Sequence, residues 1–194
     1  MKVVLPSTSK YKNQVLDTVG IKHSYIDSNY DETLLKEENV YEYVKELAFN
    51  KANNVIDKVS DSLIIGLDSI VYANNKILEK PKDINDAKEA IKMCKNNITS
   101  VITGISIINQ KTNEIIKDYA ETKIKLRDID DIDIDYYLNN EPDIMHASGF
   151  IIETIMSNFI EKIEGSYYNI LGAPVEKIYK HINNMGYHLI DLEK

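Results

Sequence analysis

Residues 63–71 read LIIGLDSIV, an apolar run of mainly β-branched and leucine side chains that reaches the carboxylate of Asp68. A run of this kind that closes at Gly66 predicts a buried strand over residues 63–66. In α/β folds the chemistry gathers where such strands end, so Asp68 is the first catalytic candidate. The alternative interpretation is that Asp68 only caps a turn or the next element.

The rest of the chain alternates patterns typical of strands and helices, which predicts an α/β protein. Strands are predicted at residues 3–5, 70–72, 99–109, 114–126 and 167–171. Helices are predicted at residues 11–19, 37–59 and 83–94, from about residue 130, and from residue 174 to about 186. Asn74-Asn75 predicts a hairpin turn, and Asp83 predicts a helix cap.

Length and composition predict one compact domain over residues 1–194, built as two lobes around one cleft. With 43% hydrophobic and 28% charged residues, the chain can bury a substantial core and does not have the composition of a disordered protein. Cys94 is the single cysteine, which excludes an intramolecular disulfide and favours a reducing compartment. The opening apolar run is too short for a signal peptide, and no segment approaches transmembrane length. We therefore expect a cytoplasmic protein.

The formal net charge of −8 argues against binding of long nucleic acids, which requires an extended basic surface. It does not argue against a single nucleotide. A triphosphate can be held by a few lysines and a divalent cation that brings its own positive charge to acidic ligands.

Six segments occur in a fixed order: LPSTSKYKNQVL (residues 5–16), SNYDE (28–32), LIIGLDSIV (63–71), EKP (79–81), SVITGIS (100–106) and YYNILGAPV (167–175). In order and spacing they resemble the Maf family of nucleotide pyrophosphatases, over about residues 3–182. The resemblance implies a fold like that of inosine triphosphatases, with a long bent mixed sheet, flanking helices and a central nucleotide-binding cleft. It also implies a homodimer.

The resemblance assigns roles to the acidic residues. Asp68 matches the family's aspartate and would be the general base in hydrolysis between the α- and β-phosphates of a nucleoside triphosphate. Glu32 matches the second acid of a family pair and would hold Mg²⁺ or Mn²⁺ together with Asp68, since hard oxygen ligands suit these ions. Asp31 is a weaker third ligand. Without the resemblance, Asp31 and Glu32 are interpreted as a solvated acidic turn.

The resemblance also assigns residues that handle phosphate. Lys80 matches a catalytic lysine of the family, and Lys51 matches the lysine on its long helix. Ser7 and Ser9 offer hydroxyls and backbone amides before the first helix, where anions bind readily. Taken singly, each lysine is interpreted as an ordinary surface residue.

Residues 9–12, SKYK, depart from the family's SPRR, because Tyr11 and Lys12 replace two arginines. Lysine keeps a positive charge but loses the planar fork that grips a phosphate at two points. We therefore expect weaker activity or a shifted position of the phosphates.

The choice of base is predicted from three residues. Tyr11 and Glu153 match the branch of the family that acts on 7-methyl-GTP, where an aromatic ring stacks on the cationic purine and a carboxylate accepts from its donors. Ser69 favours dTTP and UTP instead, because the dTTP/UTP branch of the family has a small hydroxyl residue at this position. A surface position for both Tyr11 and Glu153 is the remaining interpretation.

Two classes of function follow. The first is a metal-dependent nucleoside triphosphate pyrophosphatase, with a preference for 7-methyl-GTP or, as the alternative, for dTTP and UTP. The second is a nucleotide-binding protein of weakened catalysis that regulates septum formation, in line with what the family is associated with. The four histidines show no metal-ligand spacing and are expected to be surface or structural residues.

Overall fold

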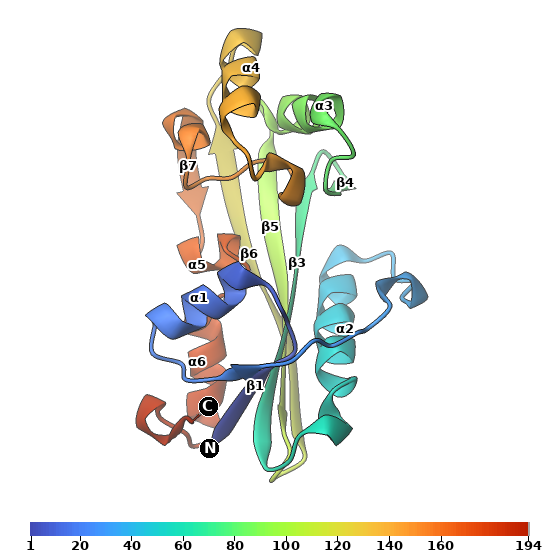
Figure 1. Ribbon diagram of the computed structural model, residues 1–194, viewed down its shortest axis with the longest axis vertical. Coiled ribbons are helices and arrows are strands. Elements are labelled where there is room, and N and C mark those ends of the chain that lie inside the picture. Colours follow the sequence, from blue (N-terminus) through green and yellow to red (C-terminus); the bar gives the residue numbers. More distant parts are fainter. Residues whose placement is uncertain (194) are drawn as a thin grey trace. The chain divides into compact units, whose positions relative to one another are not determined.

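The computed structural model describes residues 1–193, which form a mixed α/β structure with helices around a seven-stranded sheet (Figure 1). The sheet order is β2-β1-β3-β5-β6-β7, and β4 pairs with β3 off this path. β1 runs parallel to β2 and β3, whereas β4 and β7 are antiparallel to their neighbours. The strands are β1 Lys2–Leu5, β2 Ser24–Tyr25, β3 Ser62–Ala73, β4 Lys76–Leu78, β5 Ile98–Asn109, β6 Glu114–Leu126 and β7 Ile160–Glu164. The predicted α/β class with a mixed sheet is confirmed.

The helices are α1 Lys10–Thr18, α2 Val40–Asn53, α3 Ile84–Cys94, α4 Asp131–Asn140, α5 Tyr167–Ile170 and α6 Val175–Asn184. Short 3-10 turns occupy Glu32–Leu34, Ile56–Lys58, Ile144–His146, Ile155–Phe159 and Leu189–Asp191. Within the described residues, no helix combines the length and the apolar character that crossing a membrane requires.

The chain divides into two compact units. The first unit comprises Met1–Ser69, Ile102–Ala120 and Ser166–Lys194, and the second comprises Ile70–Val101 and Glu121–Gly165. The residues of β3, β5 and β6 are shared between the two units.

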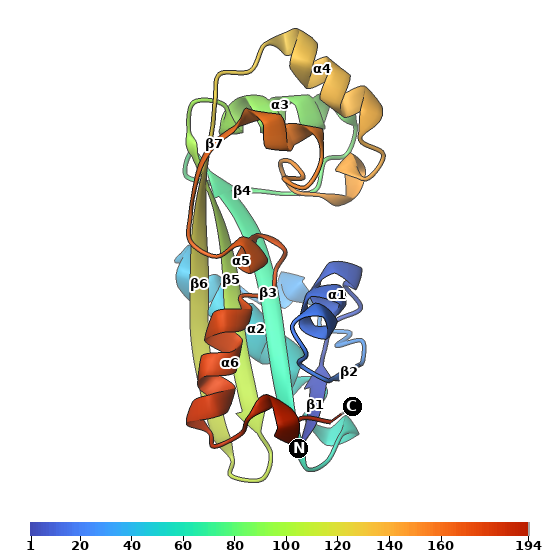
Figure 2. The same ribbon diagram turned by 90° about the vertical axis from the view of Figure 1, so that its left-hand side faces the viewer.

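In the first unit, helices cover both faces of the strands, with α2 on one face and α6 on the other (Figures 1 and 2). Alternate residues of β3 serve the two faces, as expected for a strand with a period of two. The face toward α1 and α6 holds a buried core that includes Leu5, Leu16, Leu63, Ile65, Leu67, Ile105, Ile178 and Ile182. The opposite face packs Ile64 and Ile108 against Ala52 and Val55, at the end of α2 and just beyond it.

Two glycines let α2 approach the strands closely. A Cβ atom on Gly66 of β3 would lie 2.0 Å from the Ala48 carbonyl oxygen, and one on Gly104 of β5 would lie 1.9 Å from the Val44 carbonyl oxygen. Both separations are far inside van der Waals contact, so any larger residue would push the helix away. Glycine at these two positions therefore sets the distance between α2 and the sheet.

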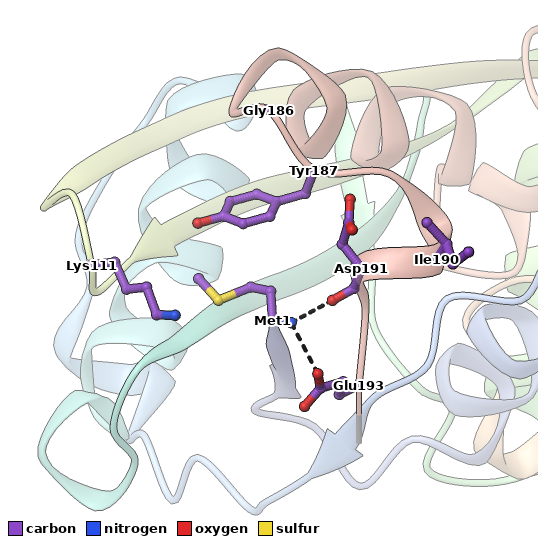
Figure 3. Close-up of a pocket in the computed structure, with 7 residues that line it drawn as sticks. All are labelled: Met1, Lys111, Gly186, Tyr187, Ile190, Asp191 and Glu193. Carbon is purple, nitrogen blue, oxygen red and sulfur yellow. Dashed lines mark hydrogen bonds and ion pairs between the residues drawn. The ribbon is translucent and has the colours of Figure 1, made fainter.

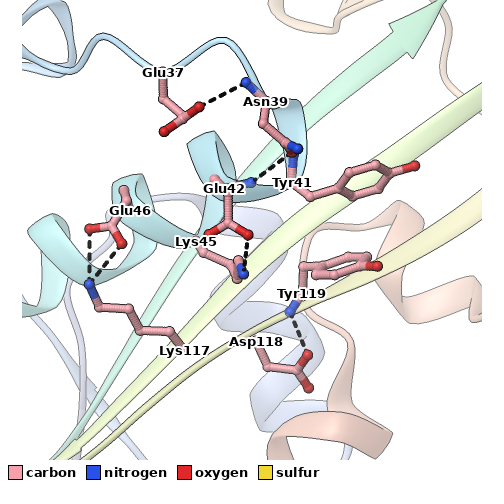
Figure 4. Close-up of polar contacts among 9 residues, drawn as sticks. All are labelled: Glu37, Asn39, Tyr41, Glu42, Lys45, Glu46, Lys117, Asp118 and Tyr119. Atoms are coloured by element: carbon pink, nitrogen blue, oxygen red, sulfur yellow. Dashed lines mark hydrogen bonds and ion pairs between the residues drawn. The ribbon is translucent and has the colours of Figure 1, made fainter.

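Polar contacts orient α2 over the strands (Figure 4). Asn39 caps the helix, since its side-chain oxygen accepts from the backbone N–H groups of Tyr41 and Glu42. Lys117 of β6 donates to the Glu46 carboxylate at 2.8 and 2.9 Å. The cap satisfies backbone N–H groups at the start of α2, and the Lys117 contact ties the helix to β6.

In the second unit, α3 and α4 lie side by side, and each buries part of its surface, with Ile91 buried on α3 and Ile134 on α4 (Figures 1 and 2). Ion pairs of Lys88 with Asp135 and of Lys95 with Asp128 join α3 and its end to α4 and the preceding segment. The buried Tyr137 hydroxyl accepts from the Ile151 backbone N–H at 2.9 Å, and burial raises the pKa of Tyr137 to about 12. This bond holds the segment that carries Glu153.

Several predicted elements need correction. The strand predicted for residues 63–66 continues through Gly66, and Asp68 lies inside β3 instead of following it. The helix predicted for residues 37–59 is shorter, because α2 ends at Asn53 and a 3-10 turn follows. The strand predicted for residues 167–171 is wrong: Tyr167–Ile170 form α5, because Ser166 caps a helix there by accepting from the Asn169 N–H. Strand β7 was not predicted.

Candidate functional site

The candidate site begins where β1 leaves the sheet. β1 pairs with β3 only as far as Val4–Ile64, and β1 ends at Leu5. The flank of β3 beyond Ile64 is not covered by β1, and there the Lys12 ammonium donates to the Leu67 carbonyl at 2.9 Å. Functional side chains often gather at the carboxyl end of a parallel strand. Here the strand that ends is β1, and its end leaves the flank of β3 beyond Ile64 without a paired strand.

Lys51 joins the two predicted acids. Its ammonium contacts the Glu32 carboxylate at 2.7 Å and also donates to the carboxylate of Asp68. Asp68 is buried, at 7% exposure, whereas half of the Glu32 side chain is exposed. Burial alone would lower the pKa of Lys51, but the two carboxylates outweigh burial and raise it. Lys51 is therefore a cation that compensates two anions, and the three residues form one electrostatic group.

The loop that carries Glu32 is tied to α2. The Asn50 side chain donates to the Tyr30 hydroxyl at 3.1 Å, and the Asn54 side chain donates to the Ser28 carbonyl at 2.6 Å. Both asparagines come from the same end of the helix as Lys51. The loop therefore presents Glu32 to Lys51 although it contains little regular structure.

Tyr43 lies in the field of the same acids. Burial raises the pKa of Tyr43, and the charges of Asp68 and Glu32 raise it further. Its phenol thus keeps its proton and can donate a hydrogen bond.

Ser69 belongs to the opposite face of β3. Its hydroxyl lies 2.9 Å from the hydroxyl of the fully buried Thr103. Gly172 has a φ of +82°, and a Cβ atom there would lie 3.0 Å from Lys12 Cε and 3.1 Å from Ser69 Oγ. Lys12, Ser69 and the Gly172 backbone are therefore immediate neighbours, and a larger residue at position 172 would crowd both side chains.

Ser7 and Ser9 form the turn between β1 and α1. The Ser7 hydroxyl accepts from the Ser9 N–H at 3.2 Å, and the Ser9 hydroxyl caps α1 by accepting from the Lys12 N–H. The Asn13 side chain donates to the carbonyls of both Ser7 and Ser9, at 3.2 and 2.8 Å. The turn is thus held by hydrogen bonds among its own residues and by the Asn13 side chain, which lies one helical turn further along α1.

The other predicted residues, Tyr11, Lys80 and Glu153, have exposed side chains. Tyr11 is the second residue of α1 and is 46% exposed. Lys80 and Glu153 belong to the second unit, and both side chains are exposed. Their part in the site remains a prediction.

The acidic residues fit a divalent cation in part. Among residues 1–193, no group of three or more His, Cys, Asp or Glu side chains is placed to hold a metal ion. Asp31 uses its carboxylate within its own turn, where the Thr33 hydroxyl and N–H lower its pKa. Glu32 and Asp68, which share one ammonium, supply two hard oxygen ligands. That number suits Mg²⁺, which is usually held by one or two carboxylates together with substrate phosphates.

A separate hollow of about 480 Å³ lies at the opposite end of β3 (Figure 3). It is lined by Met1, Lys111, Gly186, Tyr187, Ile190, Asp191 and Glu193. The hollow lies near the start of β3, where Lys2 pairs with Ser62. Asp68 and Ser69 lie at the end of the part of β3 that belongs to the first unit. The hollow therefore contains none of the predicted site residues.

Four supporting residues were not predicted from the sequence: Asn13, Tyr43, Asn50 and Thr103. Asn50 and Asn54 recur at helical spacing beside Lys51, and this pair of amides on an amphipathic helix was an available signal. Asn13 and Thr103 gave no such signal. Asn13 donates to backbone carbonyls, and the Thr103 hydroxyl pairs with Ser69, a residue of a different strand.

We predict that Lys51→Ala lowers the free energy of unfolding by about 2 kcal/mol, because it leaves the buried Asp68 carboxylate beside Glu32 without its cation. Lys45→Ala is the matched control, since Lys45 is also on α2 and pairs with the half-exposed Glu42. That surface pair should contribute less than about 0.5 kcal/mol. Urea unfolding of both variants measures the difference, and equal losses would contradict the bridging role.

Comparison with known proteins identifies relatives over nearly the whole chain. A Clostridium botulinum (strain Okra / Type B1) protein named dTTP/UTP pyrophosphatase is 35% identical over 191 residues, covering 96% of this chain and 98% of the relative. A Thermoanaerobacter sp. (strain X514) protein of the same name is 33% identical over 180 residues, covering 92% and 94%. The solved structure of the Staphylococcus aureus Ham1 protein is similar with a TM-score of 0.44 and 13% identity, over 65% of this chain and 72% of that one. The family model described as Maf-like protein matches residues 2–185, and the chain belongs to the Maf family.

Proposed function

We propose that this protein is a nucleoside triphosphate pyrophosphatase that converts dTTP and UTP to the monophosphate and pyrophosphate. The observation that carries the proposal is the Lys51 ammonium shared by Glu32 and Asp68, because it unites three residues that match family positions. The names of the relatives from Clostridium botulinum and Thermoanaerobacter support the choice of substrates.

Asp68 acts as the general base. A water molecule attacks a phosphorus atom of the α–β linkage, a new P–O bond forms, and the bridging P–O bond breaks. The water proton passes to the Asp68 carboxylate, and the leaving group departs with the bridging oxygen. Lys51 orients that carboxylate and partly offsets the repulsion between the acids and the incoming triphosphate.

The triphosphate charge is met by cations and amides on the other face of β3. The Lys12 ammonium donates to the Leu67 carbonyl and brings its positive charge to the open flank of β3, where the Lys12 side chain neighbours the Gly172 backbone. The turn of Ser7 and Ser9 precedes the N-terminus of α1, where backbone amides favour anions. Lys80, an exposed residue of the second unit, is proposed as a catalytic lysine from the family resemblance alone.

We assign a divalent cation, Mg²⁺ or Mn²⁺, to Glu32 and Asp68. When bound, it would polarise the phosphate oxygens and neutralise charge that develops on them. Both carboxylates are close to Lys51, whose positive charge supplies part of the same compensation within the chain itself.

A preference for 7-methyl-GTP is the second candidate. Tyr11 presents an exposed ring at the start of α1, and Glu153 presents an exposed carboxylate on the segment held by Tyr137. An aromatic face and a carboxylate suit a cationic purine. Ser69 supports dTTP and UTP instead. We also propose a cytoplasmic location, from the single cysteine, and a homodimer, from the family resemblance.

We predict that Asp68→Asn lowers turnover by at least about a hundredfold, which is the usual scale for loss of a general base. Asp61→Asn is the matched control, because Asp61 is exposed and immediately precedes the start of β3. Pyrophosphate release from UTP with Mg²⁺ or Mn²⁺, with circular dichroism to verify folding, measures the effect. Turnover at the parent rate in folded Asp68→Asn would remove Asp68 from the mechanism.

The choice of base is tested by turnover on dTTP, UTP, CTP, GTP and 7-methyl-GTP, for the parent and Glu153→Gln. We expect the parent to prefer dTTP and UTP, and Glu153→Gln to leave that order unchanged. A parent that prefers 7-methyl-GTP, with about a tenfold shift toward pyrimidines in Glu153→Gln, would establish the second candidate. A protein that binds nucleotide but releases no pyrophosphate from any of the five would instead be a binding protein.

A further inference from the structure

His23 is a buried histidine that the proposed reaction does not use. Its side chain is 2% exposed, and both ring nitrogens have close partners. Nδ1 lies 2.9 Å from the Ile21 carbonyl oxygen, and Nε2 lies 2.9 Å from the Asn13 side-chain oxygen. The residue is therefore built into the structure directly behind the side chain that holds the Ser7–Ser9 turn.

The partners determine the direction of each hydrogen bond. The Asn13 amide nitrogen faces the Ser7 and Ser9 carbonyls, which can only accept. The amide oxygen of Asn13 is therefore the atom that faces His23, and Nε2–H donates to it. The Ile21 carbonyl also can only accept, so Nδ1–H donates as well. An imidazole ring that donates from both nitrogens is an imidazolium cation.

We propose that His23 is a positioning residue, a buried imidazolium that holds the Ser7–Ser9 turn through Asn13 and supplies positive charge behind it for a polyphosphate ligand. The inference rests on the proposed function for the identity of the ligand. Among the described residues, Asp17 faces the ring, with Oδ1 3.9 Å from Nδ1, and its side chain is more than half exposed. A carboxylate at this distance pairs with the ring when the ring is protonated.

The positive charge of His23 would compensate in part for the two arginines that are missing from residues 9–12, SKYK. Tyr11 carries no charge, and one donor of the Lys12 ammonium is directed to the Leu67 carbonyl. A charge buried behind the turn acts on a bound anion with less screening than a surface lysine would. The Asn13 contacts also fix two carbonyls of the turn, which keeps those oxygens directed at the amide instead of at the phosphates.

The protonation state is tested directly by nitrogen-15 NMR of the histidine rings in the full-length chain at about pH 7. His23→Gln identifies the His23 resonances by their disappearance. The result expected is that both ring nitrogens of His23 carry protons. A bare nitrogen would overturn the proposal, whatever the enzyme hydrolyses.

The role in ligand binding is tested by calorimetry with two probes, inorganic tripolyphosphate and the non-hydrolysable α,β-methylene analogue of UTP. We expect His23→Gln to weaken both by about fivefold or more, the scale of a lost charge-assisted hydrogen bond. His188→Gln is the matched control, because its ring contacts the exposed Asn183 side chain at 3.2 Å and has no part in the turn. Parent-like affinity in folded His23→Gln would overturn the proposal.

A third variant, Asn13→Ala, distinguishes a positioning role of His23 from a general contribution to the stability of the fold. Asn13→Ala removes the link, so the losses in affinity from Asn13→Ala and His23→Gln should overlap in the double variant instead of adding. Additive losses, or no binding of either probe by the parent, would overturn the role in binding. Tight binding of both probes without pyrophosphate release would instead remove the proposed function and leave the role of His23 in place.

Discussion

The close approach of α2 to the sheet is the constraint on which the rest of the site depends. Carbonyl oxygens of Val44 and Ala48 occupy the space where side chains at Gly104 and Gly66 would begin. Because both glycines lack a Cβ atom, the helix lies low enough for Lys51, on its next turn, to reach the carboxylate of Asp68. A wider gap would separate a buried carboxylate from its cation, at a cost of several kcal/mol.

From that contact the site divides between the two faces of β3. On the α2 face, Lys51 holds Asp68 and the more exposed Glu32 within one electrostatic group. On the other face, the Ser69 hydroxyl pairs with that of Thr103, and the Lys12 ammonium donates to the Leu67 carbonyl, next to Asp68. β1 makes this possible, because it accompanies β3 only part of the way and leaves the flank beyond Ile64 open.

Much of the fold was predictable because it follows from local patterns. The two long strands and their turn lie at residues 98–126 as expected, and Asn74-Asn75 adopts the positive φ values, +48° and +60°, of a tight hairpin. The error at Tyr167–Ile170 arose because tyrosines favour strands, whereas the Ser166 cap decides for a helix. The expectation that chemistry lies at a strand end was applied to β3, but the strand that ends at the site is β1.

The resemblance supplied the positions of Glu32, Lys51 and Asp68, and these three side chains do meet in the structure. Their roles stay predictions. What the sequence could not supply is the framework around them. Asn13 and His23 act through carbonyl groups, and any residue provides a carbonyl, so no pattern of side chains marks them. Asn50 differs, because its spacing from Asn54 was an available signal, but its partner Tyr30 lies twenty positions away and was not predictable.

We propose that Glu32, Lys51 and Asp68 form the reacting centre. A crystal structure with Mn²⁺ and the α,β-methylene analogue of UTP puts this to the test, because anomalous scattering locates Mn²⁺ independently of the protein. We expect Mn²⁺ on the carboxylates of Glu32 and Asp68, with the α- and β-phosphates of the analogue against it. Mn²⁺ and nucleotide bound elsewhere, with Lys51 still joining the two acids, would contradict it.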